Sequence, residues 1–282
     1  MKFLCLNGAY GSADKFQVQL APLLKDLMDV GDGQVSTFYF THGPCKAVPP
    51  PGFEDYFGPA PHFRFIEPDV TASSGCADDV LSRIRNFPQC ETAEDTMREL
   101  LRGEQDSEYE SSETDDSDSS MAGGRAPVAS AHRSTNNAIK YILNIVKKHG
   151  PFDAIIGYSE GATIAATMLL YQQRQQKRWG TKPMFKYGIF FAGWPPLDPK
   201  THDIVLADES DERIETRTLH IVGSLDPYID GSMALFNVCD MDSAVLFDHA
   251  KGHTLPRDKD TIRELVDVIC DTVAEMREAG EY

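Results

Sequence analysis

Residues 152–166 read FDAIIGYSEGATIAA, a run of apolar residues, a glycine-flanked serine and an alanine-rich segment. The apolar run at 154–156 predicts a buried β-strand, and the alanine-rich run at 162–166 predicts an α-helix. Between them, residues 157–161 read GYSEG, a Gly-x-Ser-x-Gly pattern. In a tight turn from strand to helix, side chains two positions before and after the serine would collide with neighbouring backbone, so glycine is needed there. The pattern and its flanks predict that Ser159 projects its hydroxyl from a strained turn.

The rest of the chain repeats this alternation of strand and helix. Apolar runs predict strands, and apolar residues spaced three and four apart predict amphipathic helices. The predicted strands span residues 2–6, 35–40, 152–158, 187–192, 218–222 and 244–247. The predicted helices span residues 12–28, 78–87, 138–149, 161–173, 228–239 and 261–276, with Ser12 or Asp14 capping the first. We therefore expect one α/β domain over residues 1–282, with a mostly parallel sheet and helices on both faces.

Two segments interrupt the alternation. Residues 43–75 are rich in proline and aromatic side chains, and Pro49-Pro50-Pro51-Gly52 cannot form regular structure. The aromatic side chains of this segment either pack onto the domain as core or wall an apolar substrate pocket. Residues 104–124 are acidic and low in complexity, which predicts a disordered insertion.

Composition argues against several classes of protein. The formal net charge of −17 argues against nucleic-acid binding, which needs a basic face to neutralise phosphates. No stretch reaches the ~18 apolar residues of a membrane-spanning helix, so no membrane span is expected. The opening run is cut by Asn7 and Gly8, too early for a secretory signal, which makes the cytoplasm the expected location. The six cysteines form no Cys-x-x-Cys pair and are expected to be reduced.

A serine nucleophile needs a neighbouring base, and the base needs an acid that orients it. In this setting the chain order is serine, then acid, then histidine. His253 lies in a glycine-containing loop between the last predicted strand and the last predicted helix, where it would reach Ser159, and His249 is the second candidate. His220 falls inside a predicted strand, and His202 comes too early in the order. A metal site at His249 and His253 lacks a third ligand, so no metal or organic cofactor is expected.

The orienting acid is expected in the loop after the predicted strand at 218–222. That strand is followed by Gly223-Ser224-Leu225-Asp226-Pro227, which places Asp226 at the edge of the sheet where the active sites of α/β proteins gather. Asp226 would accept a hydrogen bond from one imidazole nitrogen and so fix the tautomer of the histidine. Asp230 is the alternative acid.

A tetrahedral oxyanion needs two backbone N–H donors. One is expected from Glu160, which follows the serine at the start of a helix. The other is expected from the loop after the first strand, with Ala9 as first choice and Tyr10 as second, because Gly8 and Gly11 let this backbone bend toward a substrate. The side chain of Glu160 is expected to face outward or to cap the helix.

Five short motifs together resemble the FSH family of serine hydrolases, which have the α/β-hydrolase fold. The motifs are Leu6-Asn7-Gly8, Gly157-Tyr158-Ser159-Glu160-Gly161-Ala162, Phe190-Phe191-Ala192-Gly193, Gly223-Ser224-Leu225-Asp226 and Gly252-His253-Thr254-Leu255-Pro256. The resemblance covers almost the whole chain. It departs at the acidic insertion, at Asn7, where the family often has histidine, and at Lys251, where it often has glycine. The three candidate catalytic residues are unaffected, although Asn7 alters the oxyanion loop.

The resemblance implies a serine esterase or thioesterase that acts on an acyl chain. For LovG-like fungal members it implies release of a polyketide from the carrier domain of a polyketide synthase. Aromatic side chains near the predicted site are compatible with an apolar acyl pocket, lined by Phe57, Phe191, Trp194 and Tyr228. Two alternatives stay open: an acyltransferase that uses the same triad, and a non-catalytic member of the fold that binds a ligand or a partner.

Overall fold

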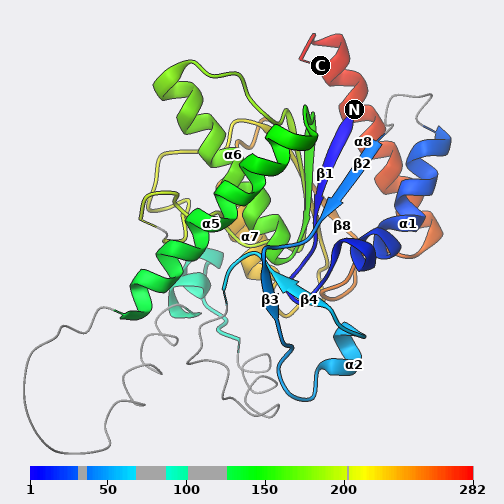
Figure 1. The fold of residues 1–282 in the computed structure, drawn as a ribbon. Helices are drawn as coiled ribbons and strands as arrows, with labels where there is room; N and C mark the ends of the chain where they lie inside the picture. The colour runs from blue at the N-terminus through cyan, green and yellow to red at the C-terminus, as the bar shows by residue number, and fades with distance from the viewer. Residues whose placement is uncertain (31–36, 68–86, 101–125, 202, 282) are drawn as a thin grey trace, which may run out of the picture.

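The centre of the molecule is a six-stranded sheet in which every neighbouring pair of strands is parallel (Figure 1). The computed structural model describes residues 1–30, 37–67, 87–100, 126–201 and 203–281. The strands of the sheet, in chain order, are β1 (Lys2–Leu6), β2 (Thr37–Thr41), β5 (Ala154–Tyr158), β6 (Tyr187–Phe191), β7 (Arg217–Val222) and β8 (Ala244–Asp248). The predicted parallel α/β sheet is therefore confirmed.

The order of the strands explains where a site can form. Across the sheet the order is β2-β1-β5-β6-β7-β8, so β2 and β5 lie on opposite sides of β1. The winding thus reverses between β1 and β5, and open α/β sheets bind ligands at the carboxyl ends of strands at such a point. The turn after β5 and the loop after β1 meet there, because a Cβ added to Gly8 would lie 3.3 Å from Cβ of Ser159.

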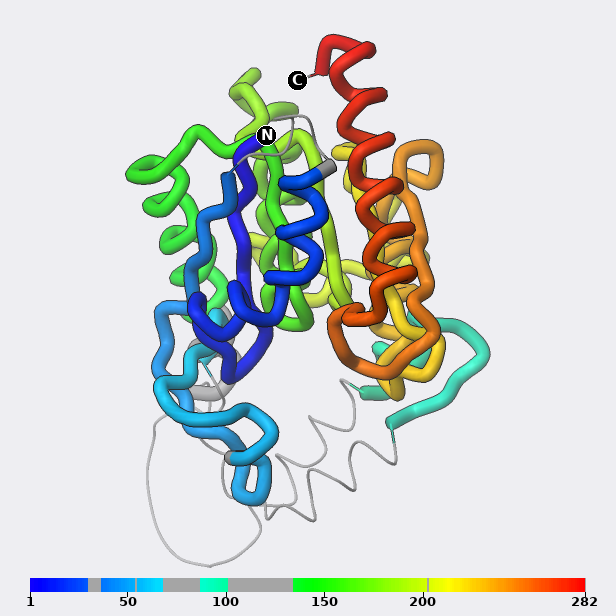
Figure 2. Tube along the Cα trace, turned by 90° about the vertical axis from the view of Figure 1, so that its right-hand side faces the viewer, coloured from blue at the N-terminus to red at the C-terminus, as the bar shows by residue number. Residues whose placement is uncertain are grey.

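Helices cover both faces of the sheet (Figure 1, Figure 2). Two of them, α1 (Ala13–Val30) and α8 (Lys259–Glu278), pack side by side on one face. The other face is covered by α5 (Ala126–His149), α6 (Glu160–Trp179) and α7 (Ile229–Asn237). This arrangement confirms the expectation of helices on both faces, although α5 begins well before its predicted start.

Capping groups set the limits of several helices. The hydroxyl of Ser12 accepts a hydrogen bond of 3.3 Å from the N–H of Lys15, so Ser12 rather than Asp14 caps α1. Gly180 adopts φ of 64° and ends α6 beyond its predicted limit. The carboxylate of Asp258 accepts from two N–H groups in the first turn of α8. Each cap satisfies backbone groups that the helix itself leaves without a partner.

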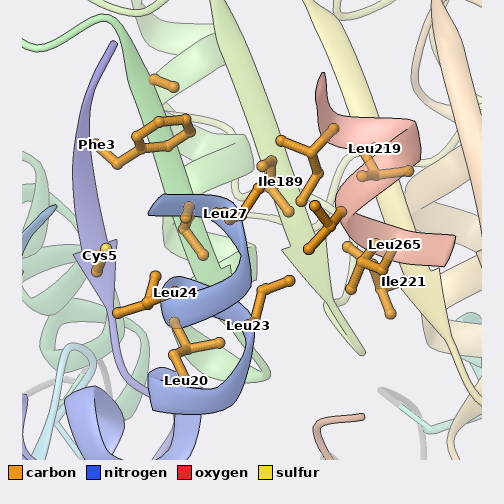
Figure 3. Packing of buried hydrophobic residues seen from close by; sticks show 14 of the residues in the cluster. Phe3, Cys5, Leu20, Leu23, Leu24, Leu27, Ile189, Leu219, Ile221 and Leu265 are labelled. Atoms are coloured by element: carbon orange, nitrogen blue, oxygen red, sulfur yellow. The ribbon is translucent and has the colours of Figure 1, made fainter. Parts of the chain in front are cut away.

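The face under α1 and α8 holds an apolar core (Figure 3). Leucine side chains from both helices point toward side chains of β1, β6 and β7. The labelled members are Phe3, Cys5, Leu20, Leu23, Leu24, Leu27, Ile189, Leu219, Ile221 and Leu265, all of them buried. Burial of each large side chain contributes roughly 1.5–3 kcal/mol to the stability of the fold. This core therefore holds the sheet, and the loops at its carboxyl edge, in place.

The proline-rich segment contains a small antiparallel hairpin that the sequence did not predict. Strand β3 (Cys45–Ala47) pairs with β4 (His62–Arg64), and the short helix α2 (Glu54–Phe57) lies between them. The aromatic residues of this segment differ in their burial. Phe65 is buried in the core on the α5 and α6 face, whereas Tyr56 is 68% exposed.

Several predicted features lie outside the described residues. They include the insertion at 104–124 and all of the helix predicted at 78–87 except Phe87. Within the described ranges, no helix is both long enough and apolar enough to cross a membrane. The cysteines described there are free, namely Cys5, Cys45, Cys90, Cys239 and Cys270.

Candidate active site

The predicted nucleophile sits in the turn from β5 to α6. Ser159 has φ of 52° and ψ of −121°, a conformation that residues other than glycine rarely adopt. A Cβ added to Gly157 would lie 2.4 Å from Cα of Ala162, and one added to Gly161 would lie 2.4 Å from the carbonyl oxygen of Leu6. Both glycine positions therefore exclude a side chain, and the strained turn presents the serine at the carboxyl edge of the sheet.

Ser159, His253 and Asp226 form one chain of hydrogen bonds. Nε2 of His253 lies 3.1 Å from Oγ of Ser159, and Nδ1 of His253 lies 2.7 Å from Oδ2 of Asp226. The second carboxylate oxygen of Asp226 accepts from the N–H of Tyr228 over 2.8 Å. The Asp226 side chain is 2% exposed, and that of His253 is 22% exposed. This geometry lets the histidine take the serine proton while the buried carboxylate holds the imidazole in one tautomer.

Backbone contacts hold the loops of the acid and the base together. Strands β7 and β8 are parallel neighbours, so the loops that follow them leave the same edge of the sheet. The N–H of Leu225 donates to the carbonyl of Lys251 over 3.0 Å. Gly223 lies so close to the same loop that an added Cβ would be 2.1 Å from the Lys251 carbonyl oxygen. The two loops therefore support one another beside Ser159.

The alternative residues are placed differently. His220 is buried in β7, where burial lowers its pKa to about 3. Burial also lowers the pKa of His249, and its Nδ1 has no hydrogen-bond partner among the described residues. Oδ2 of Asp230 accepts from the hydroxyl of Thr96 over 2.9 Å, and His202 lies outside the described residues. No group of three His, Cys, Asp or Glu side chains in the described part of the chain is placed to hold a metal ion.

The candidate oxyanion donors flank the nucleophile. A backbone hydrogen bond of 3.1 Å closes the turn over Ala9 and Tyr10, and Tyr10 adopts φ of 58°. The neighbouring Gly8 is the residue that approaches Cβ of Ser159. On the other side, the N–H of Glu160 begins α6 and has no acceptor within its own helix. The turn that contains Ala9 and Tyr10 therefore begins next to Ser159, and Glu160 follows Ser159 in the chain.

The prediction for the side chain of Glu160 is wrong. It neither faces outward nor caps the helix, and it is 10% exposed. Its carboxylate accepts from Nε of Arg64 over 3.1 Å and from the N–H groups of Phe65 and Ile66 over 3.2 Å each. Its partner Arg64 lies 96 residues earlier in the chain, so no local pattern could signal the contact.

Of the four predicted pocket residues, Tyr228 packs against His253, Trp194 packs against Tyr228, and Phe57 packs against Tyr10. The ring of Tyr228 is 5.5 Å from that of His253, and the ring of Trp194 is 6.0 Å from that of Tyr228, measured between centroids. The ring of Phe57 lies 4.9 Å from that of Tyr10. Aromatic side chains therefore stand beside both the base and the oxyanion loop.

The prediction that Phe191 lines the pocket is wrong. Its side chain is 1% exposed and belongs to the core under α1 and α8. Successive side chains of a strand point to opposite faces, so Tyr187, Ile189 and Phe191 share this core while Phe190 packs on the other face. The backbone of Phe191 still supports the site, because its carbonyl accepts from the N–H of Ser159 over 2.8 Å.

Phe87 is a residue near the site that the sequence did not reveal. Its ring centroid lies 5.1 Å from that of Tyr228 and 6.1 Å from that of Trp194. It was predicted to end a short helix, but it lies in an irregular segment. The hydrogen bond from Thr96 to Asp230 ties the helix at residues 93–100 to α7. The aromatic partners of Phe87 come more than a hundred residues later in the chain, so no local pattern around Phe87 indicates the contact.

Comparison with known proteins identifies the class. The parallel sheet and its strand–turn–serine–helix unit define an α/β-hydrolase fold, and the crystal structure of esterase PE8 shares it. That structure aligns with a TM-score of 0.51 at 16% identity and covers 96% of this chain and 92% of the other. A family model described as serine hydrolase (FSH1) matches residues 1–265. The chain therefore belongs to the FSH1 family of serine hydrolases.

Curated relatives show how far the similarity extends. The chain is 35% identical to Esterase FUS5 of Gibberella moniliformis over 138 residues, which are 48% of this chain and 53% of that protein. It is 29% identical to Esterase OVCA2 of Xenopus tropicalis over 107 residues, which are 38% of this chain and 43% of that protein. The chain thus spans about half the length of these relatives.

Proposed function

We propose that this protein hydrolyses a carboxylic ester or thioester through an acyl-enzyme formed on Ser159. The observation that carries the proposal is the continuous hydrogen-bond chain from Asp226 through His253 to Ser159. A serine hydroxyl is a weak nucleophile at neutral pH until a positioned base takes its proton. Membership of a serine hydrolase family and the names of the esterase relatives support the same chemistry.

The first half of the reaction forms the acyl-enzyme. Oγ of Ser159 attacks the carbonyl carbon while Nε2 of His253 takes the hydroxyl proton, and Asp226 stabilises the resulting imidazolium. The N–H groups of Glu160 and Ala9, or of Tyr10 in place of Ala9, hold the oxyanion. The tetrahedral intermediate then collapses, the bond to the leaving oxygen or sulfur breaks, and His253 returns the proton to the departing alcohol or thiol.

The second half releases the acid. A water molecule gives a proton to His253 and attacks the acyl carbon, so that a second oxyanion occupies the same donors. When this intermediate collapses, the bond to Oγ of Ser159 breaks and the serine recovers its proton from His253. The residues described here account for each proton transfer.

The aromatic side chains beside the site support an apolar acyl group as the substrate. Trp194, Tyr228 and Phe87 form one cluster beside the base, and Phe57 stands near the oxyanion loop. Apolar and aromatic walls with a few convergent polar groups are typical of small-molecule sites. The resemblance to LovG-like members extends the proposal to an acyl chain, such as a polyketide, that is held as a thioester on a carrier protein.

Hydrolysis of matched acyl esters and acyl thioesters of increasing chain length tests the proposal. We expect turnover that rises with chain length and that disappears in Ser159→Ala. Preference for the thioester of each pair would support the carrier-bound substrate, and preference for the oxygen ester would favour a free small molecule. Absence of turnover across the whole series, with correctly folded protein, would contradict the proposal. Product analysis with added alcohols separates hydrolysis from acyl transfer.

A further inference from the structure

An ion pair between Glu160 and Arg64 lies one residue from the nucleophile. Nε and Nη2 of Arg64 are each 3.1 Å from Oε1 of Glu160. The two N–H groups of Phe65 and Ile66 complete the hydrogen bonding of this carboxylate. The side chains are 24% exposed for Arg64 and 10% exposed for Glu160, so water screens their charges less than it would on the surface.

The carboxylate of Glu160 stands in an unfavourable place for the proposed chemistry. The backbone N–H of the same residue is proposed to donate to the oxyanion, which carries a full negative charge in the tetrahedral intermediate. A negative charge on the residue that donates to the oxyanion repels it in a partly desolvated site and would raise the barrier. The guanidinium of Arg64 supplies the compensating positive charge, and the two backbone N–H groups hold the carboxylate on the side of the hairpin.

Arg64 also reaches the second source of oxyanion donors. Its guanidinium carbon lies 5.4 Å from the ring centroid of Tyr10, which is within the range of a cation–π contact. Tyr10 belongs to the turn that approaches the nucleophile, and its φ of 58° shows that this turn needs support from its surroundings. One side chain from β4 therefore contacts the residues on both sides of the oxyanion site.

We infer that Arg64 is a positioning residue for the oxyanion site, where it neutralises Glu160 and fixes the turn that contains Tyr10. The inference rests on the proposed function, because it assigns a task to Arg64 in the same acyl transfer. A purely structural role of Arg64 in the hairpin would act through packing. Under the inferred role, removal of Arg64 slows the reaction because the charge on Glu160 is left without a partner.

A double-mutant cycle separates these two roles. We expect Arg64→Gln to lower kcat for an acyl ester, and the rate of inactivation by a fluorophosphonate, by about tenfold or more, with a much smaller change in KM. Adding Glu160→Gln to that variant removes the uncompensated carboxylate and should restore a large part of both rates. Arg64→Lys keeps the charge without the planar fork and should fall between wild type and Arg64→Gln.

Arg174→Gln provides a matched control. Arg174 is also 24% exposed and also binds two carboxylates, those of Asp198 and Glu212 at 2.9 and 2.8 Å. It lies fifteen residues along α6 from Ser159, which places it about 22 Å away at the helical rise per residue. We expect this variant to lose thermal stability to a degree similar to that of Arg64→Gln while it keeps wild-type kcat.

Two results would overturn the inference. Arg64→Gln could retain wild-type kcat and inactivation rate, or the double variant could be as slow as the single variant, which would show that the charge on Glu160 does not matter. A wild-type protein that neither hydrolyses esters nor reacts with the fluorophosphonate would overturn the proposed function itself, and the inference with it. That outcome is distinguishable because it is seen before any substitution at Arg64 or Glu160.

Discussion

The hydroxyl of Tyr158 donates a hydrogen bond of 2.9 Å to the backbone carbonyl of His253, so the residue before the nucleophile holds the loop of the base. The two rings also lie 5.6 Å apart between centroids. Burial raises the pKa of Tyr158 above its ordinary value of 10, so its hydroxyl stays a donor into the alkaline range. The contact joins the end of β5 to the loop after β8 and supports the approach of His253 to Ser159.

Tyr158→Phe should lower kcat by about three- to tenfold, because a neutral hydrogen bond contributes roughly 1 kcal/mol and its loss loosens the loop of His253. KM should change little, since the ring and its packing remain. Steady-state kinetics on an acyl ester, with thermal denaturation to verify the fold, measures both effects. Unchanged kcat would show that other contacts alone hold the loop in place.

Asp226→Asn should lower kcat by about a thousandfold or more, because an amide no longer fixes the reactive tautomer of His253 or stabilises the imidazolium. Asp230→Asn is the matched control, since Asp230 follows in the same region but accepts from Thr96 and not from the histidine. We expect the control to keep kcat within about threefold of wild type. A larger loss in Asp230→Asn than in Asp226→Asn would reverse the assignment of the acid.

His220 should make the protein less stable in weak acid. Burial lowers its pKa to about 3 from an ordinary value of 6.5. Between these values the unfolded chain binds a proton that the native protein does not, so the free energy of unfolding decreases as the pH falls. From pH 7.5 to pH 5 this group alone should lower it by about 2 kcal/mol.

Urea denaturation of wild type and His220→Gln at these two pH values measures the contribution of His220. The variant has no titrating group at this position, so its free energy of unfolding should fall less across the interval by about that amount. The comparison uses the change with pH for each protein, which removes the effect of the substitution on packing. An equal pH-dependent loss in both proteins would contradict the buried neutral state of His220.

Phe87→Ala should weaken the binding of long acyl chains more than that of short ones. Its ring stands against Tyr228 and Trp194, and loss of a large apolar side chain from a pocket wall costs roughly 1.5–3 kcal/mol. KM for the longest ester in a series should therefore rise about tenfold or more. Trp179→Ala, at a position 64% exposed at the end of α6, should leave every KM unchanged. A uniform rise across all chain lengths would place Phe87 outside the acyl pocket.

The sequence predicted the residues of the hydrogen-bond chain because each one carries a local signal. Ser159 lies between two glycines that the turn requires, and Asp226 and His253 follow the ends of two consecutive strands. Parallel neighbours end at the same edge, so the topology brings these residues together once the order of strands is right. The loop of Ala9 and Tyr10 follows β1, the parallel neighbour of β5, and so leaves the same edge of the sheet.

Features built from distant contacts were not predictable in this way. The Glu160 carboxylate binds Arg64, which lies in the β3–β4 hairpin. Each strand of that hairpin has three residues, too few to show a periodic pattern in the sequence. Phe87 reaches the site only through tertiary packing. The error for Phe191 has a different cause. Side chains alternate along β6, so Phe191 points to the same face as Ile189. This alternation could have been applied to the sequence alone.

Reaction with a fluorophosphonate, followed by intact-mass analysis and peptide mapping, shows directly whether Ser159 is an activated nucleophile. Wild type, Ser159→Ala and Ser224→Ala are compared, since Ser224 is an exposed serine two residues from Asp226. We expect one phosphonyl adduct on Ser159 in wild type and in Ser224→Ala, and none in Ser159→Ala. An adduct on Ser159→Ala, or none on folded wild type, would contradict this expectation.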